Sequence, residues 1–88
     1  MAFARVNGIV IHHEIRGPAA GPTVAFSNSL GTDLRIWDLV VERLPKEWRL
    51  LRYDKRGHGL SEGTPGFTTQ DEVADLAALL AHLGISRT

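Results

Sequence analysis

Two apolar runs of strand length, each followed by a helical pattern, constrain the fold of this chain most. In the first run, residues 23–27, Val24, Ala25 and Phe26 stand in a row, as in a parallel strand that is buried on both faces. The second run covers residues 48–53. Strands that alternate with helices build mostly parallel sheets covered by helices, so this order predicts an α/β fold.

The helical patterns cover residues 33–44 and 69–83. Thr32 or Asp33 can cap the first helix, Pro45 ends it, and its predicted buried stripe is Trp37, Val40, Val41 and Leu44. Residues 69–72, Thr-Gln-Asp-Glu, are typical of a capping box, and the predicted stripe of the second helix is Val73, Leu76, Ala77, Leu80 and Leu83. Gly84 suits the left-handed position after the last turn, and Ile85 can pack back on that turn.

An antiparallel hairpin is predicted before this α/β part. Residues 3–6 and 9–16 are separated by Asn7-Gly8, which suits the two positive-φ positions of a type I′ turn. Side chains alternate between the two faces of a strand, so the consecutive His12 and His13 point to opposite faces. We therefore expect no metal pair from these two histidines.

The composition argues against several classes of partner. The formal net charge of the 88 residues is zero, so no electrostatic field favours nucleic acid or an anionic membrane. There is no cysteine, no compact set of metal ligands and no Gly-rich phosphate motif, so we predict no disulfide, no metal and no cofactor. The sequence shows no secretory pattern and no apolar run of about 18 residues, so a cytoplasmic protein is expected.

Residues 59–63, Gly-Leu-Ser-Glu-Gly, match the G-x-S-x-G nucleophile pattern, but we interpret the match as accidental. A nucleophile elbow places its serine on a sharp turn directly between a strand and a helix. Here the preceding strand ends well before Ser61, and a Thr-Pro-Gly turn follows. Asp75 and His82 follow in the hydrolase order but lie about 10 Å apart along one helix. We predict that Ser61 is not a nucleophile.

Two loop sequences carry a resemblance to a known family. Residues 54–61, Asp-Lys-Arg-Gly-His-Gly-Leu-Ser, resemble the D-x-R-G-x-G-x-S loop of α/β-hydrolases, and residues 27–32, Ser-Asn-Ser-Leu-Gly-Thr, are similar to 3-oxoadipate enol-lactonases. The resemblance covers nearly the whole chain. It implies a mostly parallel eight-stranded sheet of order 1-2-4-3-5-6-7-8, of which this chain holds strands 1–4 and helices A and B. Residues 1–88 would then be the N-terminal portion of one domain, incomplete without strands 5–8.

The resemblance implies one catalytic group in this chain. In the fold, the loop after the third strand supplies a backbone N–H to the oxyanion hole. Aligning Asn28-Ser29 on the His-Gly of many hydrolases makes Leu30 the donor, with Asn28 and Ser29 as candidate substrate-binding residues. Arg35 is a candidate contact for a substrate carboxylate, and the alternative is a solvated helix arginine. The family's Ser/Asp/His triad is expected outside this chain.

For residues 54–59 the favoured role is structural. The glycines supply unusual backbone angles, while Asp54 and Arg56 tie the loop to its neighbours. Trp37 and Trp48 are expected in the core, and His82 on a solvated helix surface.

The function implied by the resemblance is hydrolysis of 3-oxoadipate enol-lactone to 3-oxoadipate, a step of the β-ketoadipate pathway of aromatic compound catabolism. Its partners would be a small-molecule lactone or ester and the remainder of the hydrolase domain. Two alternatives stay open: another α/β-hydrolase (a carboxylesterase, C–C hydrolase or cofactor-free haloperoxidase), or a non-catalytic piece that needs a partner chain bearing strands 5–8. In every case we expect the 88-residue chain alone to be inactive.

Overall fold

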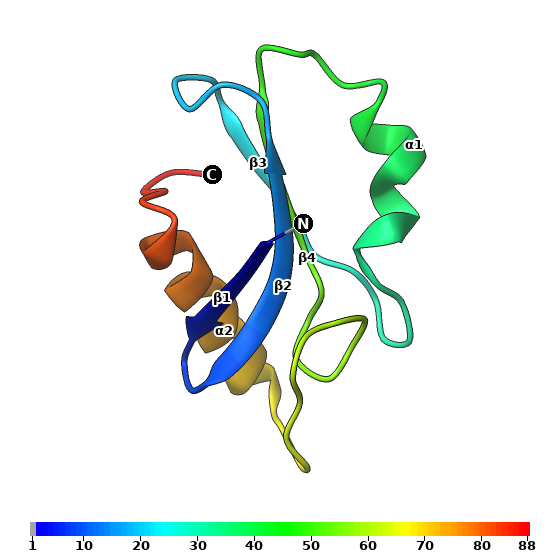
Figure 1. Cartoon of the computed structure of the whole chain (residues 1–88), viewed down its shortest axis with the longest axis vertical. Helices are drawn as coiled ribbons and strands as arrows, with labels where there is room; N and C mark the ends of the chain where they lie inside the picture. Colours follow the sequence, from blue (N-terminus) through cyan, green and yellow to red (C-terminus); the bar gives the residue numbers. More distant parts are fainter. Residues whose placement is uncertain (1) are drawn as a thin grey trace.

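The fold is a four-stranded sheet with one helical layer on each face (Figure 1). The computed structural model describes residues 2–88. The strands are β1 (Ala2–Val6), β2 (Ile9–Arg16), β3 (Thr23–Phe26) and β4 (Arg49–Tyr53). The helical elements are the 3₁₀ helix η1 (Leu34–Trp37), α1 (Asp38–Val41) and α2 (Thr69–His82). The predicted α/β class and the order of the strands along the chain are confirmed.

The strands lie in the order β1-β2-β4-β3. β1 pairs with β2 and β2 with β4 antiparallel, while β3 and β4 run parallel. This is the order that the resemblance implied for the first four strands of the hydrolase sheet. Among the described residues β3 pairs with no strand but β4, and the Thr23 carbonyl accepts from the Thr88 hydroxyl at 3.1 Å. The other edge of β3 is therefore open to a further strand.

The β1–β2 turn has the predicted geometry. Asn7 and Gly8 have φ angles of 47° and 80°, as a type I′ turn requires, and Val6 faces Ile9 across it. Asn7 is the only non-glycine residue with positive φ among residues 2–88. Asn tolerates this region, so the turn sequence fixes the register of the hairpin.

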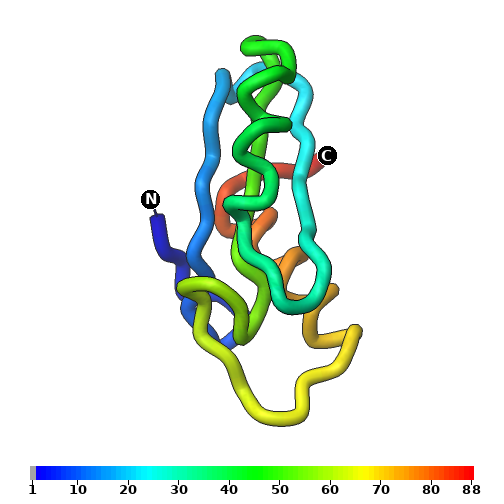
Figure 2. Tube along the Cα trace, turned by 90° about the vertical axis from the view of Figure 1, so that its right-hand side faces the viewer, coloured from blue at the N-terminus to red at the C-terminus, as the bar shows by residue number. Residues whose placement is uncertain are grey.

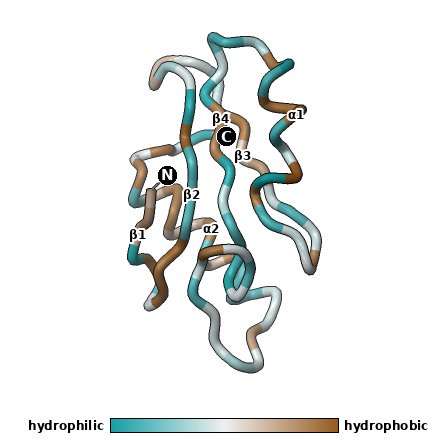
Figure 3. The backbone as a smooth tube through the Cα atoms, turned by 45° about the vertical axis from the view of Figure 1, so that its right-hand side comes forward, coloured by the Kyte–Doolittle hydropathy of each residue, from teal (hydrophilic) through white to brown (hydrophobic). Residues whose placement is uncertain are grey.

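The two faces of the sheet carry different cores. The α2 side joins both strands of the hairpin, β4 and α2 through Ala4, Val6, Ile9, Ile11, Leu51, Tyr53, Leu79 and Ile85. The core cluster on the α1 side is smaller and consists of Phe26, Val41 and Leu50, with Trp37, Leu44 and Trp48 partly buried against them. The hydropathy colouring shows apolar stretches along α1 (Figure 3), and Leu39 is 70% exposed.

The helix predicted over 33–44 is present in a shorter and less regular form, over Leu34–Trp37 and Asp38–Val41. The chain forms one 3₁₀ turn and one α turn, and Val40 of the predicted stripe is exposed. Tertiary contacts explain the 3₁₀ turn, because the Leu34 carbonyl accepts a hydrogen bond from Nη1 of Arg52 at 3.1 Å. The Asp38 N–H bonds to the carbonyl of Arg35, three residues back, instead. Asp33 caps this element, as predicted.

The start and the buried face of α2 differ from the prediction. The N-cap is Thr68, whose hydroxyl accepts from the Asp71 N–H at 3.2 Å, so the capping box begins one residue earlier. Leu76, Leu80 and Leu83 of the predicted stripe pack against the core. Val73 is exposed, and the fully buried positions are Leu79 and Asp75, which turns inward to Arg56. The predicted end is confirmed, since Gly84 has a φ of 71° and the Ile85 N–H donates to the Leu80 carbonyl at 2.9 Å.

Candidate functional site

Two loops leave the carboxyl ends of the parallel strands β3 and β4 at one end of the sheet (Figure 2). We call residues 27–33 the β3 loop and residues 54–61 the β4 loop. In α/β sheets, ligands bind at the carboxyl ends of the parallel strands. The residues that the sequence singled out lie in these loops or just beyond them, so this end of the sheet is the candidate site.

The β3 loop exposes the backbone amide of Leu30. Leu30 is 71% exposed, and its N–H donates no hydrogen bond within residues 2–88. Gly31 has a φ of 79°, and the Thr32 hydroxyl donates to the Ser29 carbonyl at 2.6 Å. A tight turn with an unused amide at Leu30 has what an oxyanion donor requires.

Asn28 anchors the start of the β3 loop. Its side chain is 5% exposed, and Oδ1 accepts a hydrogen bond from Nε1 of Trp37 at 3.1 Å. Burial inside the chain favours a structural role for Asn28 over the predicted substrate contact. Sequence reasoning placed Trp37 in the core and gave no signal for this bond, which joins residues nine positions apart.

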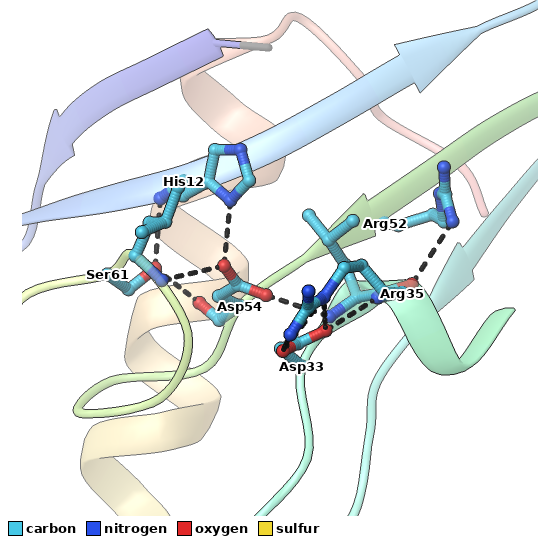
Figure 4. A network of polar contacts seen from close by, with 8 residues as sticks. His12, Asp33, Arg35, Arg52, Asp54 and Ser61 are labelled. Atoms are coloured by element: carbon cyan, nitrogen blue, oxygen red, sulfur yellow. Dashed lines mark hydrogen bonds and ion pairs between the residues drawn. The ribbon is translucent and has the colours of Figure 1, made fainter. Parts of the chain in front are cut away.

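Asp54 is the centre of the polar network in Figure 4. Its Oδ1 accepts from the Leu34 N–H at 2.8 Å, and its Oδ2 accepts from the Leu60 N–H at 2.9 Å. Nδ1 of His12 lies 2.7 Å from Oδ2 and donates to it. One buried carboxylate thus joins β2, the β4 loop and the start of η1.

Ser61 is fixed by hydrogen bonds to two backbone groups. Its hydroxyl donates to the Asp54 carbonyl at 2.6 Å and accepts from the His12 N–H at 2.9 Å (Figure 4). β4 ends at Tyr53 and α2 begins at Thr69, so Ser61 does not lie directly between a strand and a helix. This geometry favours a structural role for Ser61 and supports the interpretation that the G-x-S-x-G match is accidental.

Arg56 extends the β4 loop's contacts to α2. Its Nε and Nη2 donate to the two carboxylate oxygens of Asp75, each at 2.8 Å, and Asn7 donates to the same carboxylate at 2.8 Å. Burial raises the pKa of Asp75, but the hydrogen bonds from Arg56 and Asn7 outweigh this and leave the pKa below its ordinary value. Asp75 is therefore a structural anion.

Arg35 is held by its neighbour in sequence. Its guanidinium lies 2.8 Å from Asp33, whose pKa this bond lowers to about 2. Arg35 lines a groove of about 480 Å³ with His12, Arg52, Asp54 and Leu60. Asn28, Ser29 and Leu30 do not line this groove, so the structure does not bring Arg35 together with the β3 loop residues in one pocket. The pairing favours the alternative reading of Arg35 as a surface arginine.

Other ionisable residues add no site of their own. His13 lies on the opposite face of β2 from His12 and is 4% exposed, and burial lowers its pKa. Within residues 2–88 no group of three or more histidine and acidic side chains could hold a metal ion. In the same part of the chain, no helix is long and apolar enough to cross a membrane.

Comparison with known proteins gives the relatives of this chain. No protein-family model matches it. It is 38% identical to 3-oxoadipate enol-lactonase 1 of Acinetobacter baylyi, over 92% of this chain and 30% of that protein. The structure of the enol-lactonase from Burkholderia xenovorans is similar with a TM-score of 0.93 at 42% identity, over 99% of this chain and 35% of that one.

Similarity extends to other hydrolases. MGS-M2, an α/β-hydrolase from a deep-sea metagenome library, matches with a TM-score of 0.88 at 30% identity, over 97% of this chain and 32% of that one. An esterase from Thermogutta terrifontis matches with a TM-score of 0.81 at 30% identity, over 94% of this chain and 32% of that one. The chain therefore spans about a third of the length of the proteins it matches.

The sheet order, the two loops and these similarities define the class. The chain has the fold of the N-terminal part of an α/β-hydrolase. Within that class it resembles the N-terminal part of the 3-oxoadipate enol-lactonases.

Proposed function

We propose that this chain is the N-terminal portion of a single hydrolase domain that opens 3-oxoadipate enol-lactone to 3-oxoadipate. The observation that carries the proposal is the similarity to two enol-lactonases over nearly the whole chain, at 38% and 42% identity. Strands 5–8 and the catalytic triad would complete the domain. The reaction would belong to aromatic compound catabolism in the cytoplasm.

In this proposal the chain contributes charge stabilisation to catalysis. A serine outside these residues attacks the lactone carbonyl, an acyl-enzyme forms, and water releases the product. The oxygen of the tetrahedral intermediate carries negative charge, which the Leu30 N–H stabilises together with the amide after the nucleophile. Such a donor is worth about 2.7–4 kcal/mol in the transition state.

The roles proposed for the neighbouring residues follow from their contacts. Asn28 and Ser29 shape the turn that carries Leu30, through the bonds to Trp37 and Thr32. Arg35 would meet a substrate carboxylate only after exchange of its Asp33 partner, because the two are joined in this structure. Neutralising Arg35 should therefore raise KM if it meets substrate, and leave KM unchanged if it is a surface arginine.

A substrate panel on the complete hydrolase tests the proposal. The panel pairs 3-oxoadipate enol-lactone with simple carboxylic esters, a C–C hydrolase substrate and a halide-dependent oxidation assay. We expect the highest kcat/KM on the enol-lactone, and Leu30→Pro should lower that activity. A higher kcat/KM on a simple ester would support the second candidate, another α/β-hydrolase, which the similarity to an esterase at 30% identity favours.

A third candidate is a chain that works only with a separate polypeptide. The free edge of β3 and the exposed apolar side chains of α1 favour it, because both offer surface to a further part of the sheet. The 88-residue chain alone is expected to be inactive and poorly folded or aggregated. Co-purification with a second chain that supplies strands 5–8 would support this candidate. A sharp cooperative melt of an isolated monomer would contradict the expected poor folding of the 88-residue chain.

A further inference from the structure

Asn28 holds a buried amide of which only one half has a partner. Its Oδ1 accepts from the indole Nε1 of Trp37, and its Nδ2 is buried with no partner within residues 2–88. An indole N–H is a donor only, so it fixes which end of the amide faces Trp37. Nδ2 is therefore turned away from Trp37 and is enclosed by other atoms of this chain.

The β3 loop is anchored on both sides of Leu30. Before Leu30, Asn28 is tied to Trp37, and after it the Leu34 N–H is tied to Asp54 at 2.8 Å. Between these anchors the Thr32 hydroxyl, bonded to the Ser29 carbonyl, braces the turn. Because oxyanion donors must be held to a fraction of an ångström, the anchors set the position of the Leu30 amide.

We propose that Asn28 and Trp37 are positioning residues for the oxyanion amide of Leu30. The inference rests on the proposed function and extends it to two side chains that touch no substrate. Trp37 is the anchor in this chain.

Trp48 provides a matched control for Trp37. Both tryptophans are partly buried against Phe26, Val41 and Leu50. Within residues 2–88 the Trp48 indole makes no hydrogen bond, whereas that of Trp37 bonds to Asn28. Replacing each by phenylalanine removes similar apolar area, but only Trp37→Phe removes an anchor of the β3 loop.

The test uses steady-state kinetics of the complete hydrolase, in one chain or assembled from two. We expect Trp37→Phe to lower kcat about 10- to 100-fold with KM changed less than about threefold, because a misplacement near 1 Å can cost about 100-fold. Trp48→Phe should keep kcat within about threefold. Equal kcat for folded Trp37→Phe and the parent would overturn the proposal.

Variants of Asn28 test the same anchor from its other side. Asn28→Asp keeps an acceptor for the Trp37 indole, whereas Asn28→Ala loses it. We expect Asn28→Ala to lower kcat about as much as Trp37→Phe and Asn28→Asp to retain more of it. A folded Asn28→Ala protein with the parental kcat would overturn the proposal.

A structural readout keeps this inference separate from the proposed function. If the parent hydrolyses neither lactone nor ester, the proposed function fails, whatever the variants do. Crystal structures of the complete Trp37→Phe and Trp48→Phe proteins then decide the positioning claim. We expect the Leu30 nitrogen to move by at least about 0.5 Å in Trp37→Phe only. An unmoved nitrogen in Trp37→Phe would overturn it.

Discussion

The β3 loop and the β4 loop lie at the same end of the sheet but use their polar groups in opposite ways. In the β4 loop, Asp54 and Arg56 each make two or more hydrogen bonds to other parts of the chain, and Ser61 bonds to the His12 N–H and, within the loop, to the Asp54 carbonyl. In the β3 loop, the Leu30 amide donates to no group within residues 2–88. The difference indicates that the β4 loop fixes the neighbouring elements in place by hydrogen bonds. The β3 loop instead presents an unused N–H donor at the candidate site.

The glycines of the β4 loop serve this holding role. Gly59 has a φ of 51°, and a Cβ there would lie 2.3 Å from the carboxylate of Asp54. No side chain could occupy that position without displacing the carboxylate from His12 and from the Leu34 and Leu60 amides. The D-x-R-G-x-G-x-S pattern is therefore explained by Asp54 as a hub that needs close backbone approach.

Removing Asp75, the buried partner of Arg56, gives the strongest test of the structural role of the β4 loop. Asp75→Ala should lower the free energy of unfolding of the complete protein by about 3–5 kcal/mol, because it leaves a buried guanidinium without its carboxylate. Denaturant titration measures the loss. Glu72→Ala, which removes a looser ion pair to Lys55 at 3.4 Å, is the control and should cost at most about 1 kcal/mol. Equal losses for the two variants would contradict the assignment.

The donor role of the β3 loop is tested by removing one N–H. Leu30→Pro should lower kcat about 100- to 1000-fold, equivalent to about 2.7–4 kcal/mol, because proline has no amide hydrogen. Leu30→Ala keeps the N–H and should keep kcat within a few-fold, since the side chain is exposed. Steady-state kinetics on the enol-lactone make the measurement. If Leu30→Pro folds and retains the parental kcat, the donor is not at Leu30.

A variant of Ser61 tests whether this serine of the β4 loop is a structural residue or a nucleophile. Ser61→Ala should lower the free energy of unfolding by about 1–3 kcal/mol, because the His12 N–H and the Asp54 carbonyl lose their shared partner. The same variant should retain a readily measurable kcat. A kcat at the uncatalysed level in a folded Ser61→Ala protein would make Ser61 a nucleophile and remove the contrast between the loops.

The smallest effect is confined to acid pH. The folded-state pKa of Asp75 lies below its ordinary value of 3.8, so its stabilisation is fully present above 3.8 and is lost as the pH falls through the folded-state pKa. Unfolding free energies between about pH 2 and pH 7 should fall less steeply at the acid end for Asp75→Asn than for the parent. Parallel curves would show that Arg56 and Asn7 do not stabilise the ionised form.

The hairpin and the strands show how much local chemistry predicts. Asn7-Gly8 predicted the turn, and the strand over residues 9–16 has the predicted bounds, because a two-residue turn and a period-2 pattern act over neighbouring residues. The ends predicted for the other strands were within one residue of those observed. Of the candidate site, the sequence picked out both loops, and the role assigned to Leu30 stays a prediction.

The sequence by itself determined the α/β order, the hairpin register and the end of α2 at Gly84, since each depends on a few adjacent residues. Only the tertiary structure decided that residues 33–44 form two short turns, that Asp75 faces inward and that Asn28 bonds Trp37. Each of these depends on a partner far along the chain or on another element, such as Arg52 for the Leu34 carbonyl and Arg56 for Asp75. Local propensity cannot anticipate a hydrogen bond whose donor arrives only when the sheet and its loops have assembled.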